Sequence, residues 1–225
     1  MAYYVPKGLH YCCVDGQIVF MDLRTDAYFL LKGAPERAFR AYLSNGEIDG
    51  DDLKVLLAKG VLVERDLPAL GEHRPEVPVP RQSASELALA RMSAGPALIC
   101  EVAYLVYRTR RRLRTRNIGE LLDAHVDVCR RLHRQDDASR GYSANAFAHA
   151  AGLYRAARRF VPVEHSCLLD SLALDRFLAK RGLESRLVFG VNAEPFSAHA
   201  WLQAGDMALN ETVSYARMHT PILVL

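Results

Sequence analysis

The chain has 225 residues, of which 50% are hydrophobic, so it can bury a sizeable core as one domain or as two small ones. Its net charge of +3 does not by itself predict any class of partner. Five cysteines, an odd number without paired spacing, argue against a disulfide framework and favour reduced thiols.

The sequence offers no segment for export or for spanning a membrane. Residues 1–8 lack the apolar core of a signal peptide. The most apolar stretch, residues 96–107, is too short for a bilayer span and contains Glu101. We therefore expect a cytoplasmic protein without a membrane partner.

The N-terminal part contains strands followed by helices. Three apolar segments bounded by turn residues predict strands, at residues 10–14, 17–22 and 27–31. Asp15-Gly16, between the first two, is typical of a two-residue hairpin turn. Two helical segments, residues 35–43 and 53–59, come next, and an apolar run at 61–63 closes the unit.

A proline-rich segment divides the chain. Four prolines fall close together, at Pro68, Pro75, Pro78 and Pro80. Proline at this density is incompatible with a helix and favours an extended spacer. We therefore predict a linker over residues 67–82, between a domain of residues 1–66 and a second domain of residues 83–225.

The second domain begins with helices. Four signals predict helix starts: the capping boxes at residues 83–86 and 117–120, Pro96 and Ser143. Six arginines fall within residues 108–116. This run is typical of a solvated helix end, and it also suits docking of an acidic partner, a phosphate or a nucleic acid. Because it contains no aromatic residue for base stacking, we expect no nucleic-acid partner.

Cys167 opens the most informative segment. Apolar residues follow it at helical spacing until Gly182, namely Leu168, Leu169, Leu172, Leu174, Phe177 and Leu178. The pattern predicts an amphipathic helix with the cysteine in its first turn. The positive end of the helix dipole lowers the pKa of such a thiol, although a free cysteine is also common as a small buried hydrophobic residue.

His199 lies in the second of three predicted strands that follow this helix. The strands cover residues 187–191, 199–203 and 207–211, with a turn at residues 204–206. A thiolate needs a base or an ion-pair partner, and histidine is the usual one. The order helix, strand, strand, strand is typical of papain-like and transglutaminase-like enzymes.

Residues 167–211 resemble the B protein of lasso-peptide biosynthesis. The segments that carry the resemblance are CLLDSLAL, KRGL, LVFGV, PFSAHAW and ALNE. That family is a transglutaminase-like cysteine peptidase that removes the leader from a ribosomally made precursor. The resemblance implies Cys167 as nucleophile and His199 as base. Glu211, after Asn210, occupies the place of the family's aspartate and is one methylene longer, so Asp206 stays open as the alternative acid.

The N-terminal strands and helices resemble the leader-recognition domain related to the pyrroloquinoline-quinone chaperone. That winged-helix domain binds an extended peptide as an added strand. The resemblance implies a groove lined by one strand and one helix: Ala27, Tyr28, Phe29, Leu30, Leu31, Leu53, Leu56 and Leu57. The relatives have three helices, whereas this segment has room for two, so a structural cap on the peptidase is the alternative.

Other candidate residues are a tryptophan, several histidines and the remaining cysteines. Trp201, beside His199, either shields the base, forms the floor of the substrate cleft and so contributes to substrate binding, or lies in the core. His165 and Cys167 form a single pair without a second half, so we expect no metal and no cofactor. Cys100 and Cys129 lie in helical patterns and are expected to be packing residues, and His125 and His219 have no partner at a telling spacing.

These features predict an α+β protein with two domains. A small winged-helix-like domain, a three-stranded antiparallel sheet plus helices, precedes a helical bundle with a small sheet of the transglutaminase or papain type. The expected function is removal of a lasso-peptide leader. The expected partners are the leader region of the precursor and an asparagine-synthetase-like ATP-dependent lasso cyclase. A transglutaminase-like amidase or acyltransferase, and a non-catalytic leader-binding adaptor, are the alternatives.

Overall fold

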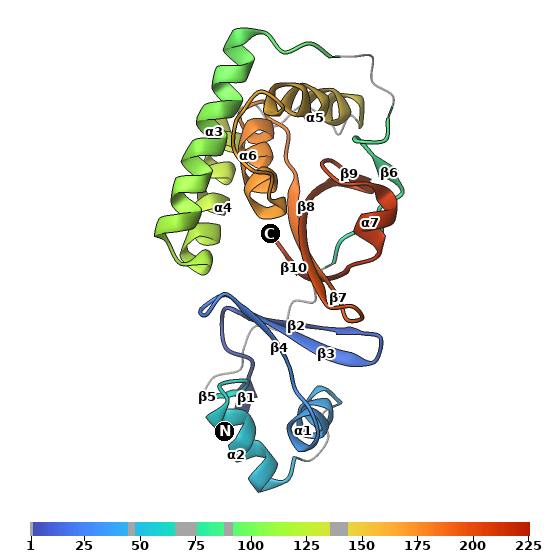
Figure 1. The fold of residues 1–225 in the computed structure, drawn as a ribbon. Coiled ribbons are helices and arrows are strands. Elements are labelled where there is room, and N and C mark those ends of the chain that lie inside the picture. Colours follow the sequence, from blue (N-terminus) through green and yellow to red (C-terminus); the bar gives the residue numbers. More distant parts are fainter. Residues whose placement is uncertain (1, 45–47, 66–75, 88–91, 136–143) are drawn as a thin grey trace. The chain divides into compact units, whose positions relative to one another are not determined.

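The computed structural model describes residues 2–44, 48–65, 76–87, 92–135 and 144–225 (Figure 1). The chain forms two compact units, Met1–Pro75 and Glu76–Leu225. Both mix helices with strands, as the α+β prediction requires. No helix among the described residues is both long enough and apolar enough to cross a bilayer.

The first unit is built on a three-stranded antiparallel sheet, in the order β2-β3-β4. Its strands are β2 (Leu9–Val14), β3 (Gln17–Asp22) and β4 (Ala27–Leu30). Asp15 and Gly16 both have positive φ, 49° and 76°, which confirms the predicted hairpin turn. A separate ribbon, in which β1 (Ala2–Tyr4) pairs with β5 (Val63–Arg65), was not expected from the sequence.

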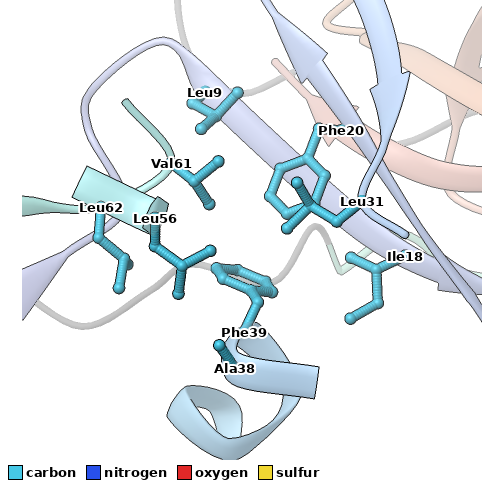
Figure 2. Close-up of a cluster of buried hydrophobic side chains, with 9 residues drawn as sticks. All are labelled: Leu9, Ile18, Phe20, Leu31, Ala38, Phe39, Leu56, Val61 and Leu62. Atoms are coloured by element: carbon cyan, nitrogen blue, oxygen red, sulfur yellow. The ribbon is translucent and has the colours of Figure 1, made fainter. Parts of the chain in front are cut away.

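Two helices cover this sheet, α1 (Ala34–Leu43) and α2 (Gly50–Ala58). Figure 2 shows the buried cluster that joins helices and strands, consisting of Leu9, Ile18, Phe20, Leu31, Ala38, Phe39, Leu56, Val61 and Leu62. The Phe20 ring lies at its centre, 4.9 Å from the Phe39 ring and 5.0 Å from the ring of Phe29 on β4. Each fully buried ring or leucine contributes about 1.5–3 kcal/mol.

The second unit packs four long helices with a five-stranded sheet. The helices are α3 (Pro96–Thr115), α4 (Ile118–Gln135), α5 (Ala144–Arg158) and α6 (Cys167–Ala179). The sheet order is β10-β7-β8-β9-β6. Its strands are β6 (Gln82–Ser83), β7 (Arg186–Asn192), β8 (Ser197–Ala204), β9 (Met207–Ala208) and β10 (Thr220–Val224). A short helix, α7 (Val213–Arg217), connects β9 to β10.

Helix α6 is the centre of the second unit. It contacts α3, α4 and α5 as well as strands β7 and β8 (Figure 1). Every residue from Ser171 to Ala179 is buried. The predicted helix exists. An amphipathic helix would have one face in solvent, and that part of the prediction is wrong because residues 171–179 of α6 have neighbours on all sides.

Two helix starts were predicted correctly, and a third was not. Pro96 begins α3, and Asn117 Oδ1 accepts a hydrogen bond of 2.9 Å from the N–H of Gly119 at the start of α4. At residues 83–86 the expected helix is absent. The Ser83 hydroxyl accepts hydrogen bonds from the N–H groups of Ser85 and Glu86, but the segment is a turn that follows β6. Ser143 lies outside the described residues.

Residues 76–82, which we expected to belong to the linker, are attached to the second unit. Strand β6 pairs in parallel with β9, and the N–H of Arg81 donates to the carbonyl of Asp206 over 2.8 Å. Gln203 Nε2 donates to the carbonyl of Pro78 over 2.5 Å. Prolines in this stretch suit an extended segment along a sheet edge as well as they suit a free spacer.

Candidate active site

Cys167 is the first residue of α6, and its side chain is exposed. Ser166 before it has an extended backbone, with φ −143° and ψ 134°, so the helix begins abruptly at the cysteine. The N–H groups of the first helical turn have no partner within the helix and point toward the helix start. The thiol therefore lies where the helix favours negative charge.

Arg158 and Asp170 hold the segment that leads into Cys167. The buried guanidinium of Arg158 donates to three backbone carbonyls, those of Val161, Val163 and Glu164. Its Nε donates to Asp170 Oδ1 over 2.5 Å. Asp170 Oδ2 in turn accepts from the N–H of Ser166 over 3.3 Å and lies 2.9 Å from His165 Nδ1. The position of Cys167 is thus fixed on both sides.

His199 on β8 and Glu211 after β9 form an ion pair. His199 Nε2 lies 2.9 Å from Glu211 Oε2. Among the described residues Nε2 has no aligned hydrogen bond, so this contact is electrostatic rather than directional. Glu211 itself is held firmly. Its carbonyl accepts from the hydroxyls of Ser83 and Ser85 over 2.6 and 3.1 Å, and its Oε1 accepts from the N–H of Thr212 over 2.8 Å.

Asp206, the alternative acid, lies in the turn between β8 and β9. In the described part of the chain, the carboxylate paired with His199 is that of Glu211 and not that of Asp206. The backbone carbonyl of Asp206 binds the N–H groups of Arg81 and Gln82. The structure therefore assigns Asp206 to the turn and to the attachment of β6.

The three side chains shift one another's pKa values. A hydrogen bond from His199 lowers the pKa of Cys167, burial opposes it, and the N–H groups of Ala200 and Leu168 lower it further. Burial alone would lower the pKa of His199, but Cys167 and Glu211 together raise it to about 9. Burial would raise the pKa of Glu211, yet His199 brings it below its usual value. These shifts favour a thiolate, an imidazolium and a carboxylate side by side.

Two residues near His199 were not identified from the sequence. The ring of Tyr215 on α7 meets the His199 ring edge-on at 4.9 Å, and the His219 ring lies 5.4 Å away. His219 Nδ1 donates to the carbonyl of Tyr215 over 2.9 Å, so its Nε2 accepts from the hydroxyl of Ser197 at 3.1 Å. These contacts enclose the imidazole of His199.

Gly190 on β7 is paired with His199 across the strands. A Cβ at this position would lie 2.8 Å from both the Trp201 ring and the Cβ of His219. Only glycine fits the space that these two side chains leave, so the glycine in the predicted strand at residues 187–191 marks a close approach of backbone and ring.

A polar chain joins the helix of Cys167 to the strand of His199. Asn210 Oδ1 accepts from the N–H of Leu202 over 2.8 Å, and its Nδ2 donates to Ser171 Oγ over 2.9 Å. The Ser171 hydroxyl donates to the carbonyl of Ala200 over 3.1 Å. These three hydrogen bonds, one buried and two part-buried, fix α6 against β8.

Trp201 does not line a surface, so its predicted role in substrate binding is wrong. Its side chain is only 1% exposed, and its Nε1 donates to Gln203 Oε1 over 3.1 Å. The ring lies 6.2 Å from that of His199 and nearly parallel to it. Alternation along β8 places Trp201 on the same face as His199, where it packs behind the imidazole.

The residues predicted to bind a leader lie in the first unit. Strand β4 ends its sheet, so one of its edges is unpaired in the part of the chain that is described. Ala27 is exposed, and Tyr28, Phe29 and Leu30 are half-buried, as are Leu53 and Leu57 on α2. Leu31 and Leu56 are 6% and 0% exposed and belong to the core (Figure 2). For these two the predicted contact with a leader is wrong, because the unit needs them for its own stability.

One buried group combines residue types that can bind a metal: His125 and Cys129 of α4 with Asp175 of α6. Asp175 Oδ2 lies 2.7 Å from His125 Nε2 and accepts from the thiol of Cys129 over 3.3 Å. Its other oxygen accepts from the Ser185 hydroxyl over 2.6 Å. The three side chains thus satisfy one another and join α4 to α6. Spacing alone could not reveal this network, because Asp175 is far from α4 in the sequence.

Comparisons with known proteins give two matches. The model of the transglutaminase-like superfamily matches residues 102–224, more than half of the chain. Over 45 residues the chain is 40% identical to the microcin J25-processing protein McjB of Escherichia coli. That match covers 20% of this chain and 22% of the relative. No solved structure matches the chain.

Proposed function

The chain belongs to the transglutaminase-like superfamily, and on this premise we propose that it is a cysteine peptidase that removes the leader of a lasso-peptide precursor. The observation that carries the proposal is the arrangement of Cys167, His199 and Glu211, with a lowered thiol pKa and a raised imidazole pKa. The similarity to a protein named for processing microcin J25 supports a peptide precursor as the substrate.

The proposed reaction has two steps. The Cys167 thiolate attacks the carbonyl carbon of the bond between leader and core, and the His199 imidazolium gives its proton to the departing amine of the core. This step breaks the peptide bond and leaves the leader as a thioester on the sulfur. Neutral His199 then takes a proton from water, the resulting hydroxide attacks the thioester, and the leader leaves as a carboxylate.

Two other groups support these steps. Glu211 faces Nε2 of His199 and so leaves Nδ1 for the thiol. Its negative charge stabilises the imidazolium in the way the acid of a catalytic triad does. The backbone N–H of Cys167, in the first turn of α6, is the proposed donor to the oxyanion of the tetrahedral intermediate.

The first unit is the proposed leader-binding module. The leader adds to the unpaired edge of β4 as a further strand, so main-chain hydrogen bonds supply much of the affinity. The half-buried side chains of Leu53 and Leu57 on α2 contact apolar leader residues. The freed core then passes to an ATP-dependent cyclase, which is the second proposed partner.

Cys167→Ala tests the nucleophile. The variant should release no core from a leader-bearing precursor, as judged by mass spectrometry, because alanine cannot form the thioester. Cys100→Ala is the matched control, since Cys100 is also an exposed, free cysteine of the second unit. Core released by Cys167→Ala at the rate of the control would reject the assignment.

A transglutaminase-like acyl transfer is the second candidate, favoured by the family to which the chain belongs. The same thioester would react with an amine in place of water. Supplying hydroxylamine during cleavage distinguishes the two reactions. A peptidase gives a leader that ends mainly in a carboxylate, whereas an acyltransferase gives mainly the hydroxamate.

A further inference from the structure

Arg176 on α6 is a buried cation without a counter-charge in the described part of the chain. The residue is 6% exposed, and its Nη2 has no hydrogen-bond acceptor among the described residues. Other buried polar groups of the same helix are satisfied, since Ser171 donates to Ala200 and Asp175 accepts three hydrogen bonds. Burial of a charge without a partner destabilises the folded protein, so an anion bound to this guanidinium would be stabilising.

The charged groups that face Arg176 have the same sign. Burial lowers the pKa of Arg176, and the guanidiniums of Arg112 and Arg108 on α3 lower it further. Cys129 and Tyr104 act in the opposite direction. Burial raises the pKa of the Cys129 thiol, so this group is neutral at physiological pH.

The only carboxylate next to Arg176 in sequence is already engaged. Asp175 binds His125, Cys129 and Ser185 with its two oxygens and is aimed toward α4. No carboxylate contributes to the pKa of Arg176 in the described structure.

The arginines of α3 are arranged along one stripe of the helix. Tyr104, Arg108 and Arg112 follow one another at intervals of four residues and therefore lie above each other. Arg108 Nη1 donates to the Tyr104 hydroxyl over 2.7 Å. Helix α3 packs against α6 (Figure 1). The guanidiniums of Arg108 and Arg112 on α3 therefore act on that of Arg176 on α6, and no carboxylate among the described residues offsets them.

We propose that Arg176, Arg112 and Arg108 form a binding site for a phosphate group. A guanidinium offers a planar fork of donors that matches phosphate oxygens two at a time, and the dianion would compensate most of the local positive charge. The site is separate from Cys167, at the opposite part of α6. It does not depend on the proposed peptidase activity. Free inorganic phosphate and a nucleotide phosphate are the two sources that share this chemistry.

Titration of the purified full-length protein with inorganic phosphate tests the site. Calorimetry at constant ionic strength, maintained with chloride, should give saturable binding to the native protein. Arg112→Gln and Arg176→Gln should each weaken it by about tenfold or more, because each removes charge-assisted hydrogen bonds. Arg114→Gln is the matched control, since Arg114 is an exposed arginine of the same helix and should bind as the native protein does.

A thermal-shift series guards against a general salt effect. Phosphate stabilises many proteins by exclusion from their surface, and that effect would raise the melting temperature of all variants equally. A shift confined to the native protein and Arg114→Gln supports the site. An equal shift in Arg112→Gln, or no saturable binding to the native protein, overturns it. If Arg176→Gln does not fold, the half-exposed Arg112 decides the question.

ADP in place of phosphate identifies the source. Tighter binding of ADP than of inorganic phosphate, lost again in Arg112→Gln, supports a nucleotide phosphate. Equal or weaker binding of ADP, with phosphate binding retained, supports free phosphate.

Discussion

The pKa values of Cys167 and His199 set a window of pH in which the thiolate and the imidazolium coexist. The lowered pKa of Cys167 means that the thiolate persists below the ordinary range of a cysteine and is lost as the pH falls through that value. The raised pKa of His199 means that the imidazolium is present below about pH 9 and is lost as the pH rises through about 9.

We therefore expect a bell-shaped dependence of kcat/KM on pH, with its basic limb near pH 9. The rate of alkylation of Cys167 by iodoacetamide should report the acidic limb directly. In His199→Ala that limb should move toward higher pH, because the hydrogen bond that lowers the thiol pKa is gone. An alkylation profile that is identical in both proteins would show that His199 does not tune the thiol.

Glu211 and Asp206 can be separated by neutral substitutions. Glu211→Gln should reduce single-turnover cleavage by about a hundredfold or more, since the imidazolium loses its compensating charge. Glu211→Asp should keep partial activity, because the negative charge is retained on a side chain that is one methylene shorter. Asp206→Asn should cleave nearly as the native protein does, because its carboxylate is not paired with His199. Circular dichroism controls for folding, and a damaging Asp206→Asn with a silent Glu211→Gln would reverse the assignment.

The proposed catalytic residues could be singled out from the sequence because each lies in a short segment with a characteristic pattern. Cys167 starts an apolar helix, His199 lies on β8, and Glu211 follows β9. Tyr215 and His219 could not be predicted, since α7 has only five residues and no usable periodicity. The sequence could not decide whether the Trp201 side chain lies at the surface or in the core, because its position near His199 on a strand does not show which face of the sheet is exposed to solvent.

At the scale of elements, α6 and the hairpins were predictable from local signals such as apolar spacing and Asp-Gly turns. Contacts between distant segments were not. Strand β6 consists of two residues, and it exists only because β9 offers it an edge. Local signals also could not show the Asp175 network or the burial of residues 171–179 of α6, because both depend on the elements that surround this helix.

Gly190 gives a test of the packing between β7 and the rings beside His199. Gly190→Ala should lower the free energy of unfolding by about 1–3 kcal/mol, because the new methyl group would press on Trp201 and His219. It should also slow cleavage, since both rings pack against His199.

Gly95→Ala is the control for this experiment. Gly95 caps α3 in the same unit, and a Cβ there meets nothing within 4 Å. Chemical denaturation of the two variants should therefore differ clearly. Equal stabilities would mean that the space around Gly190 adjusts more freely than its contacts suggest.

At the scale of the whole molecule, the two units suggest separate tasks. The affinity for the leader should depend on β4. Fluorescence anisotropy with a labelled leader peptide measures this affinity. Phe29→Pro should weaken binding more than Phe29→Ala, because proline removes an N–H and distorts the strand, whereas alanine mainly loses the contact with Phe20. A melting curve for each variant controls for folding. Equal losses would argue against strand addition.

The proline-rich segment indicates that the chain has two units. It does not indicate the residue at which the second unit begins, which is Glu76 and not Ser83. Composition marks where a helix is excluded, and it does not reveal whether an extended stretch lies free or along a sheet. Residues 76–82 lie along the sheet of the second unit, as the hydrogen bonds of Pro78 and Arg81 and the pairing of Gln82 with β9 show.

The attachment of β6 has a practical consequence for dissecting the protein. A fragment that begins at Ser83, the predicted boundary, would lose Gln82 and the backbone contacts of Pro78 and Arg81. Ser83 would still pair with Ala208, but the carbonyl of Asp206 and the edge of β9 beside Met207 would lose their partners. Such uncovered edges recruit strands from other molecules, so this fragment should self-associate, whereas one that begins at Glu76 keeps its own protective cover.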